Sequence, residues 1–285
     1  MSAFLALLSS CLWGLSDFLG GTASRRLPVP TVLGLSQLTA LLCLVPVAAG
    51  TGAFDTPPDY VLPAAIAGLV GITALGMFFR ALSIGTMGVV APVAALGVAV
   101  PVIVGLASGD SPSGWQLLGI AVAVVGVVLA SGPELSGRGA GGSRALLLAG
   151  GAAVGFGVVL LLVAQASDGP DSGAVVMTLL TMRLTSVTLM TGLLLVVVRR
   201  RGWDLAVTRA DLPLLALIGV ADAAANGTYA IASRSALVSV ASVLASLYPV
   251  VTAVLAYRVH GERLTRVQMA GVAASLAGVV LLAGG

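Results

Sequence analysis

The chain of 285 residues is 58% hydrophobic and only 9% charged, with a mean hydropathy of +1.11. A soluble domain carries about 25% charged residues, so this composition excludes a soluble protein and predicts one that crosses a membrane repeatedly. The formal net charge is +3, and the sequence contains arginine but no lysine. The arginines cluster in short loops between apolar runs, which the positive-inside rule explains without a nucleic-acid partner.

The first apolar segment is expected to remain in the protein as a helix. It has no basic region before it, and Asp17 interrupts the apolar core that a cleaved signal would need. Cys11 and Cys43 lie inside predicted helices, and no spacing suggests a disulfide or metal framework. We therefore expect both cysteines to be small buried apolar groups.

Runs of about 20 apolar residues, separated by turn-rich segments, predict an all-α membrane protein with ten transmembrane helices. The predicted spans are 2–22, 30–49, 60–82, 88–108, 113–131, 144–166, 174–198, 212–232, 236–257 and 265–282.

An internal repeat divides the chain into two halves of five spans, 1–135 and 144–285. The segment "QLLGIAVAVVGVVL" from Gln116 matches "QMAGVAASLAGVVL" from Gln268, and Pro101 matches Pro249 further upstream. Because five is odd, the second copy enters the membrane upside down. Inverted repeats with a site at their interface are typical of transporters, whereas a duplicated bundle without transport is uncommon.

The distribution of charge predicts the orientation. The predicted arginine-rich side holds Arg25, Arg26, Arg80, Arg138, Arg144, Arg199, Arg200, Arg201, Arg209, Arg258, Arg263 and Arg266. The opposite side holds Arg234 together with Asp55, Asp59, Asp110, Asp168 and Asp171. The arginine-rich loops should be cytoplasmic, which places both termini outside.

Two motifs and the doubled layout resemble the EamA-type transporters of the drug/metabolite transporter superfamily. The motifs are "CLWGLSDFLGG" near the start and the segment from Ala236 that contains "VHGERLT". The resemblance implies a small-molecule carrier that works by alternating access, often exporting amino acids, other metabolites or toxic compounds. The first half departs from the pattern, because "SGDSPSG" stands where the second half has "HGERLT", so Glu262 has no counterpart.

Ionisable residues inside the membrane are candidates for function because burying them in hydrocarbon costs several kcal/mol. Arg183 and Asp222 each lie about ten residues into their spans, so they either form a structural ion pair or flank a cavity. Asp222, Asn226 and Tyr229 share one helix face. Their counterparts in the first repeat, to within one residue, are Thr73, Met77 and Arg80. This polar face predicts either a substrate site or interhelical hydrogen bonds.

Asp17 is the candidate for proton coupling. It shares a helix face with Trp13, which is itself a candidate for binding the substrate. Desolvation favours the protonated form of a carboxylate, so Asp17 could exchange a proton against substrate. The alternative is a fixed salt bridge to Arg25, Arg26 or Arg80.

Three further residues complete the expected site. Gln37 in span two is a candidate for lining the substrate cavity. Pro101 and Pro249 would kink spans four and nine, as part of a gate or as a packing feature.

Other functional classes lack their required residues. His260, predicted in a loop, is the single histidine, and no metal-ligand, nucleophile or phosphate-binding motif occurs. Neither an enzyme nor a channel-like facilitator is therefore favoured, and no catalytic residue, metal or cofactor is expected. The sequence predicts a secondary carrier in a bacterial inner membrane that exports an amino-acid-like metabolite, with Arg183 facing a carboxylate and Asp222 an amine. Its partners would be this small molecule and the lipid bilayer, and both a monomer and a homodimer are compatible with the sequence.

Overall fold

A computed structural model describes residues 2–107, 109, 113–131, 142–168, 173–201, 207–234, 238–263 and 265–284. Within these ranges the chain is helical and contains no strand. The α-helices are α1 (Ser2–Ala23), α2 (Val29–Thr51), α3 (Val61–Ile84), α4 (Met87–Ala95), α5 (Ala99–Ala107), α6 (Gly114–Ser131), α7 (Gly142–Ala166), α8 (Gly173–Arg201), α9 (Leu212–Arg234), α10 (Val238–Ala245), α11 (Tyr248–His260) and α12 (Arg266–Gly284). Short 3₁₀ turns are η1 (Ala53–Asp55), η2 (Pro58–Tyr60), η3 (Leu96–Val98) and η4 (Arg209–Asp211).

Helices long and apolar enough to cross a bilayer account for most of the chain. Eight such stretches occur in the described residues: Ser2–Ala23, Val29–Thr51, Pro58–Ile84, Met87–Gly105, Ser143–Ala166, Gly173–Val196, Arg209–Arg234 and Val240–His260. A shorter apolar stretch, Leu117–Gly126, lies within α6. Asp110, Arg138 and Asp171, which entered the orientation argument, lie outside the described residues.

Two of the predicted spans are interrupted near mid-length, which corrects the prediction of continuous helices there. The 3₁₀ turn η3 separates α4 from α5, and two residues, Ser246 and Leu247, separate α10 from α11. Pro101 and Pro249 lie in the first turns of α5 and α11, where a missing N–H breaks no helical hydrogen bond. His260 is the last residue of α11 rather than part of a loop, because Gly261 adopts a left-handed conformation (φ 66°) that ends the helix.

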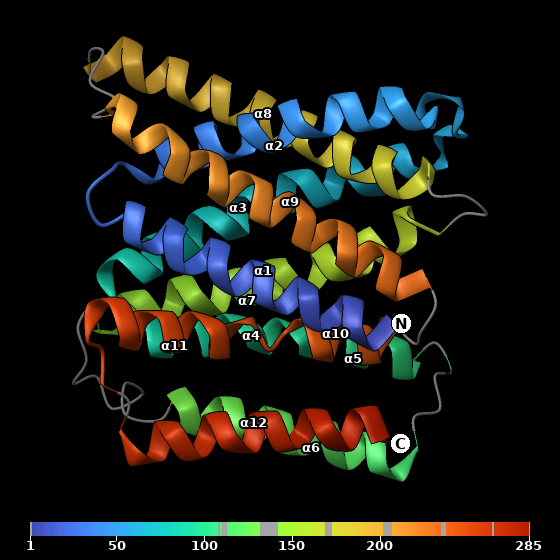
Figure 1. Ribbon diagram of the computed structural model, residues 1–285, viewed down its shortest axis with the longest axis vertical. Helices are drawn as coiled ribbons and strands as arrows, with labels where there is room; N and C mark the ends of the chain where they lie inside the picture. The colour runs from blue at the N-terminus through green and yellow to red at the C-terminus, as the bar shows by residue number, and fades with distance from the viewer. Residues whose placement is uncertain are drawn as a thin grey trace.

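The helices form a stack along the long axis of the molecule, with α2 and α8 at one end and α6 and α12 at the other (Figure 1). The most extensive contacts join α6 with α12, α3 with α7, α1 with α9 and α2 with α8, and α4 contacts α11 as α5 contacts α10. The N- and C-termini lie at the same end of the helices. The α6–α12 pair ends the stack and contacts the rest of the molecule through α4 and α10.

Glycines allow helix backbones to touch at several crossings, of which two correspond in the repeat. A Cβ at Gly219 of α9 would stand 2.0 Å from the carbonyl oxygen of Ser36 in α2. A Cβ at Gly68 of α3 would stand 2.7 Å from the carbonyl oxygen of Met182 in α8. Small residues at such crossings increase dispersion contact, which is a main source of helix association in lipid.

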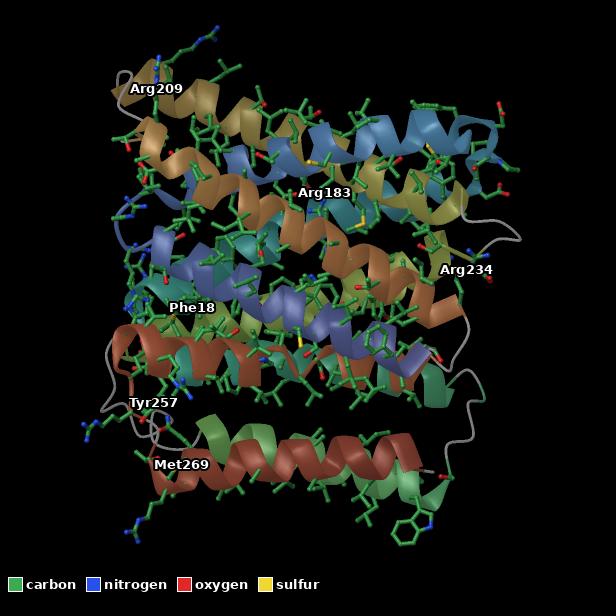
Figure 2. All side chains as sticks on the ribbon, in the orientation of Figure 1. Phe18, Arg183, Arg209, Arg234, Tyr257 and Met269 are labelled. Atoms are coloured by element: carbon green, nitrogen blue, oxygen red, sulfur yellow. The ribbon has the colours of Figure 1, made fainter. Side chains whose placement is uncertain are left out.

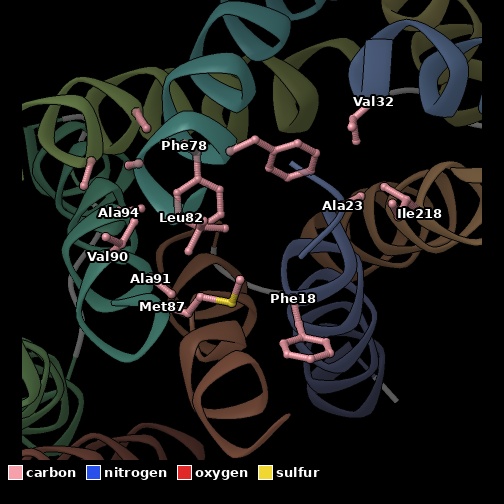
Figure 3. Packing of buried hydrophobic residues seen from close by; sticks show 14 of the residues in the cluster. Phe18, Ala23, Val32, Phe78, Leu82, Met87, Val90, Ala91, Ala94 and Ile218 are labelled. Carbon is pink, nitrogen blue, oxygen red and sulfur yellow. The ribbon is translucent and has the colours of Figure 1, made fainter. Parts of the chain in front are cut away.

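A buried aromatic and aliphatic cluster joins α1, α3 and α4 at the arginine-rich end of the molecule (Figure 3). Phe78, Leu82 and Met87 are fully buried within it, and Phe18 is 4% exposed. Phe78 contacts Tyr248 of α11 edge to face, with ring centroids 6.3 Å apart. This cluster holds α1 against the helices that line the central cavity.

The two cysteines correct a further expectation. Cys11 and Cys43 are exposed on the surfaces of α1 and α2, not buried. In a membrane protein an exposed helix face contacts lipid, so a small apolar residue is as suitable there as in the interior.

Candidate functional site

A cavity of about 780 Å³ lies among the central helices. Polar and charged residues converge on it from helices that are distant in the sequence. Its polar and aromatic wall residues are Trp13, Asp17, Gln37, Phe156, Arg183, Ser186, Asp222, Asn226, Ser246 and Tyr248. Small residues of α3, α4 and η3, among them Gly68, Gly71, Ala94 and Gly97, form much of the remaining wall and leave room for a ligand.

Arg183 and Asp222 form an ion pair in the cavity wall. Arg183 Nη2 lies 2.9 Å from Asp222 Oδ2, and both side chains are largely buried. Asp222 Oδ1 accepts hydrogen bonds from Trp13 Nε1 (3.2 Å) and Asn226 Nδ2 (3.1 Å). The charge of Asp222 is therefore compensated by Arg183, and both of its oxygens already have partners. Figure 2 labels Arg183 in the interior, far from the arginines at the helix ends.

Gln37 holds the other side of the arginine. Arg183 Nη1 donates a hydrogen bond to Gln37 Oε1, so α2, α8 and α9 are joined by one buried network. Arg183 Nε has no hydrogen-bond partner in the described structure. Among the same residues Arg183 Nη2 likewise makes no hydrogen bond, although it forms the ion pair with Asp222 Oδ2.

Asp17 lines the same cavity without a partner. Its side chain is only 6% exposed, and no hydrogen bond or ion pair engages its carboxylate in the described part of the chain. The alternative salt bridge does not form: Arg25 pairs with Glu262 and Arg26 with Asp211, while Arg80 is exposed. A buried carboxylate is costly to leave without a partner, so Asp17 is a group prepared to take up a proton or a cation.

Tyr248 provides a second buried polar group without a partner. Its hydroxyl has no hydrogen bond among the described residues, although the side chain is only 7% exposed. It lines the cavity at the start of α11, directly after the interruption between α10 and α11. Orphaned buried hydroxyls are uncommon in proteins, and one that faces a cavity is available to a ligand.

Tyr229 lies outside this wall. Its hydroxyl donates to the carbonyl of Leu160 (3.1 Å) and hydrogen-bonds with Ser242 Oγ (2.9 Å). Its ring lies 5.8 Å from that of Trp13, so it supports Trp13 from behind. On the repeat-related face, Thr73 is exposed and donates to the carbonyl of Leu69, whereas Ile72 lines the cavity.

Pro101 and Pro249 also lie outside the cavity wall, and both are buried. The interruptions that precede them do contribute wall residues, Gly97 and Val98 on one side and Ser246 on the other. The feature that reaches the cavity is therefore the break in the helix, whose position the prolines indicated only to within a few residues.

Polar contacts join α1 to neighbouring elements at the arginine-rich end. Arg25 Nη2 lies 2.8 Å from Glu262 Oε1, and Glu262 Oε2 accepts from the backbone N–H of Gly88 at the start of α4. Thr22 Oγ1 lies 2.8 Å from His260 Nε2. In these contacts the ends of α1, α4 and α11 are held together.

Sequence reasoning missed Phe156, Ser186, Ser246 and Tyr248 as wall residues. Serine and aromatic residues within apolar helices are common and give no individual signal. The repeat offers a signal for Phe156. Helices α1 and α7 are repeat counterparts that start about 140 residues apart, and a shift of 143 residues aligns Phe156 with Trp13. Both residues line the cavity.

Metal ligands do not gather in the described residues: no group of three or more His, Cys, Asp or Glu side chains is placed to hold an ion. The polar groups that do converge are a buried ion pair, a free carboxylate and a free hydroxyl.

A many-helix membrane protein with a polar cavity at its centre is the class that fold and site define. The model of the EamA-like transporter family matches residues 1–132 and 143–284, so the chain belongs to this family. It is therefore a multi-pass membrane protein of a transporter family within the drug/metabolite transporter superfamily.

Other comparisons bear on the fold alone. A solved crystal structure of a protein is 19% identical in sequence and similar over 99% of this chain and 98% of that one, with a TM-score of 0.75. No curated protein matches the sequence.

Proposed function

We propose that the protein is a secondary transporter that exports a small polar or amphipathic solute by alternating access, using Asp17 for proton coupling. The observation that carries the proposal is the unpartnered, buried carboxylate of Asp17 on the wall of a cavity built from both halves of the chain. Intramembrane carboxylates in such positions serve as proton relays in transporters.

We further propose that ten membrane helices form two inverted repeats of five. The contacts between helices support this arrangement, because exchanging the two halves reproduces them. Contact of α1 with α9 corresponds to that of α7 with α3, and contact of α2 with α9 to that of α8 with α3. Contact of α1 with α10 likewise corresponds to that of α7 with α4, and contact of α1 with α11 to that of α7 with α5. In inverted-repeat transporters the substrate site lies between the repeats.

Proton coupling requires that one group bind either a proton or the solute. The charged and titratable groups that face the cavity with Asp17 are Arg183 of α8, Asp222 of α9 and Tyr248 of α11. The first two neutralise one another, which leaves Asp17 as the group whose charge a proton or a solute can satisfy.

The bacterial inner membrane and an orientation with the arginine-rich end in the cytoplasm complete the proposal. Figure 2 labels Arg209 at one end of the helices and Arg234 at the other. The contacts of Arg25, Thr22, Glu262 and His260 would then lie at the cytoplasmic end and form part of its gate. Export follows if this gate opens to load solute while Asp17 is deprotonated.

The ion pair between Arg183 and Asp222 weakens the argument for a zwitterionic solute. A zwitterion was expected from a free Arg183 and a free Asp222, yet these residues bind one another. A zwitterion would have to break this pair, whereas Asp17 can bind a group without breaking any contact.

Flux measurements in proteoliposomes test the proposal. Labelled cations, zwitterions and anions would be followed with and without an imposed pH gradient, for the parent, for Asp17→Asn, and for Asp55→Asn as a control. Asp55 is exposed in the turn η1 and lies outside the cavity. We expect gradient-driven flux in the parent and in the control, and loss of the gradient dependence in Asp17→Asn. Equal gradient dependence in all three proteins would exclude Asp17 from proton coupling. Absence of flux for every solute would contradict the proposal that the protein is a transporter of such solutes.

A further inference from the structure

The electrostatic balance of the cavity favours a cation. Arg183 is the one basic residue on the described wall, and it is engaged by Asp222 and Gln37. Asp17 adds a negative charge that no protein group compensates. With Asp17 ionised, an anionic solute would meet repulsion, whereas a cation would meet an uncompensated carboxylate.

The aromatic residues of the wall favour a bulky organic cation over a small hydrated one. Trp13 lies one helical turn before Asp17, and Tyr248 and Phe156 face the same cavity. Aromatic faces attract ammonium groups, most strongly where water is excluded.

A second, apolar chamber lies beside the cavity. It has a volume of about 580 Å³, and its walls come from α4, η3, α5, α6 and α10 together with the turn before α11. Its single polar side chain among the described residues is Ser246, whose hydroxyl donates to the carbonyl of Val243. The chamber therefore offers no polar group to a ligand.

The two chambers share part of their walls. Ala95, Val98 and Ser246 line both. Two of these residues lie at the interruptions of the helical pieces, Val98 in η3 and Ser246 between α10 and α11. The partition is thus made of small or medium side chains at the points where the helical geometry changes.

We infer that the transported solute is an amphipathic monovalent organic cation, whose charged group binds at Asp17 and whose apolar part extends into the second chamber. The inference rests on the proposed function. At Asp17 one carboxylate exchanges one proton for one positive charge, so charge balances in each cycle. An apolar tail satisfies the second chamber, where water would find almost no hydrogen-bond partner.

Three synthetic solutes separate the parts of this inference. Octyltrimethylammonium has the cation and the tail, tetramethylammonium has the cation alone, and the N-octyl derivative of dimethylglycine has the same tail on a zwitterion. Release from proteoliposomes driven by a pH gradient would be measured for each, after subtraction of the rate from protein-free vesicles. We expect octyltrimethylammonium to be carried fastest and the zwitterion slowest.

Two variants of α6 test the chamber. Ala123 lines the second chamber but not the first, so Ala123→Phe fills the chamber; Val125 is 55% exposed on the outside of the same helix, so Val125→Phe is the control. We expect Ala123→Phe to slow octyltrimethylammonium about tenfold, the factor produced by excluding about two methylene groups, and to leave tetramethylammonium unchanged. If the two variants had equal effects, or if Ala123→Phe slowed both cations equally, the second chamber would not bind the apolar part of the solute.

Failure of the inference differs from failure of the proposed function. Gradient-driven flux of zwitterions or anions without flux of either cation would overturn the cation assignment while leaving a transporter. Loss of all cation flux in Asp17→Asn, with Asp55→Asn unaffected, is the result expected if the carboxylate binds the charge.

Discussion

Arg183 shows how one side chain can organise a membrane site without being free to bind a ligand. Its guanidinium contacts Gln37 and Asp222, and Asp222 in turn accepts hydrogen bonds from Trp13 and Asn226. The repeat relates Gln37 to Arg183. Ser36 and Met182, whose carbonyls contact the equivalent glycines Gly219 and Gly68, are separated by 146 residues. Gln37 and Arg183 directly follow them and have the same separation, so they occupy equivalent positions in the two halves.

Removing one member of the buried pair should destabilise the protein. Arg183→Gln leaves Asp222 charged and uncompensated, at a cost of about 3 kcal/mol in the free energy of unfolding. Asp222→Asn should cost a similar amount by leaving the arginine unpaired. The double variant removes both charges, so we expect it to be more stable than either single variant. Thermal unfolding in detergent would measure all three, and additive losses in the double variant would contradict the coupling.

At the scale of single residues, the sequence indicated most of the site. Five of the six predicted substrate residues and Asp17 line one cavity, because ionisable and amide side chains in apolar helices are expensive and turn inward. Tyr229 differs, since a tyrosine can satisfy its hydroxyl locally, here with Leu160 and Ser242. The absence of a partner for Asp17 could not be predicted, because it depends on where Arg25 and Arg26 find theirs.

Among the helices, the closest contacts depend on glycine. Gly219 and Gly68 are separated by 151 residues and occupy corresponding places in α9 and α3. Each brings its helix against the backbone of a neighbour, α2 and α8 respectively.

A methyl group at one of these crossings should push the helices apart. Gly219→Ala would place a carbon 2.0 Å from the carbonyl oxygen of Ser36, so one backbone must move, and we expect a loss of roughly 1–3 kcal/mol in stability. Gly192 of α8 has no atom within 4 Å of an added Cβ, so Gly192→Ala is the matched control. Thermal unfolding of both would show a fall in the midpoint for Gly219→Ala alone; equal midpoints would mean that α2 and α9 separate without cost.

Element boundaries followed from the hydrophobic pattern, whereas the interruptions did not. The predicted starts and ends of most spans agree with the helices to within a few residues, because apolar length and turn residues determine them. The breaks at 96–98 and 246–247 fall within apolar segments. In these apolar segments a nearby proline is the single sequence feature that indicates a break. Pro101 and Pro249 lie after the breaks, at the start of the next helix, and do not kink a continuous one.

For the molecule as a whole, the orientation in the membrane is open to a direct test. In a background with Cys11 and Cys43 replaced by Ser, single cysteines would be introduced as Arg234→Cys and Arg209→Cys, both at exposed positions. An impermeant thiol reagent applied to intact cells should label Arg234→Cys only, and permeabilised cells should show labelling of both. The reverse pattern would place the arginine-rich end outside and contradict the positive-inside rule for this chain.

The central position of α1 has a consequence for synthesis. Trp13 and Asp17 leave the ribosome first, yet their neighbours Asp222 and Tyr248 are made more than 200 residues later, near the end of translation. Until α9 is made, Arg183 can contact Gln37 of α2 but has no carboxylate to compensate its charge. A nascent chain halted before α9 is therefore the form in which this arginine is most costly to keep in the membrane.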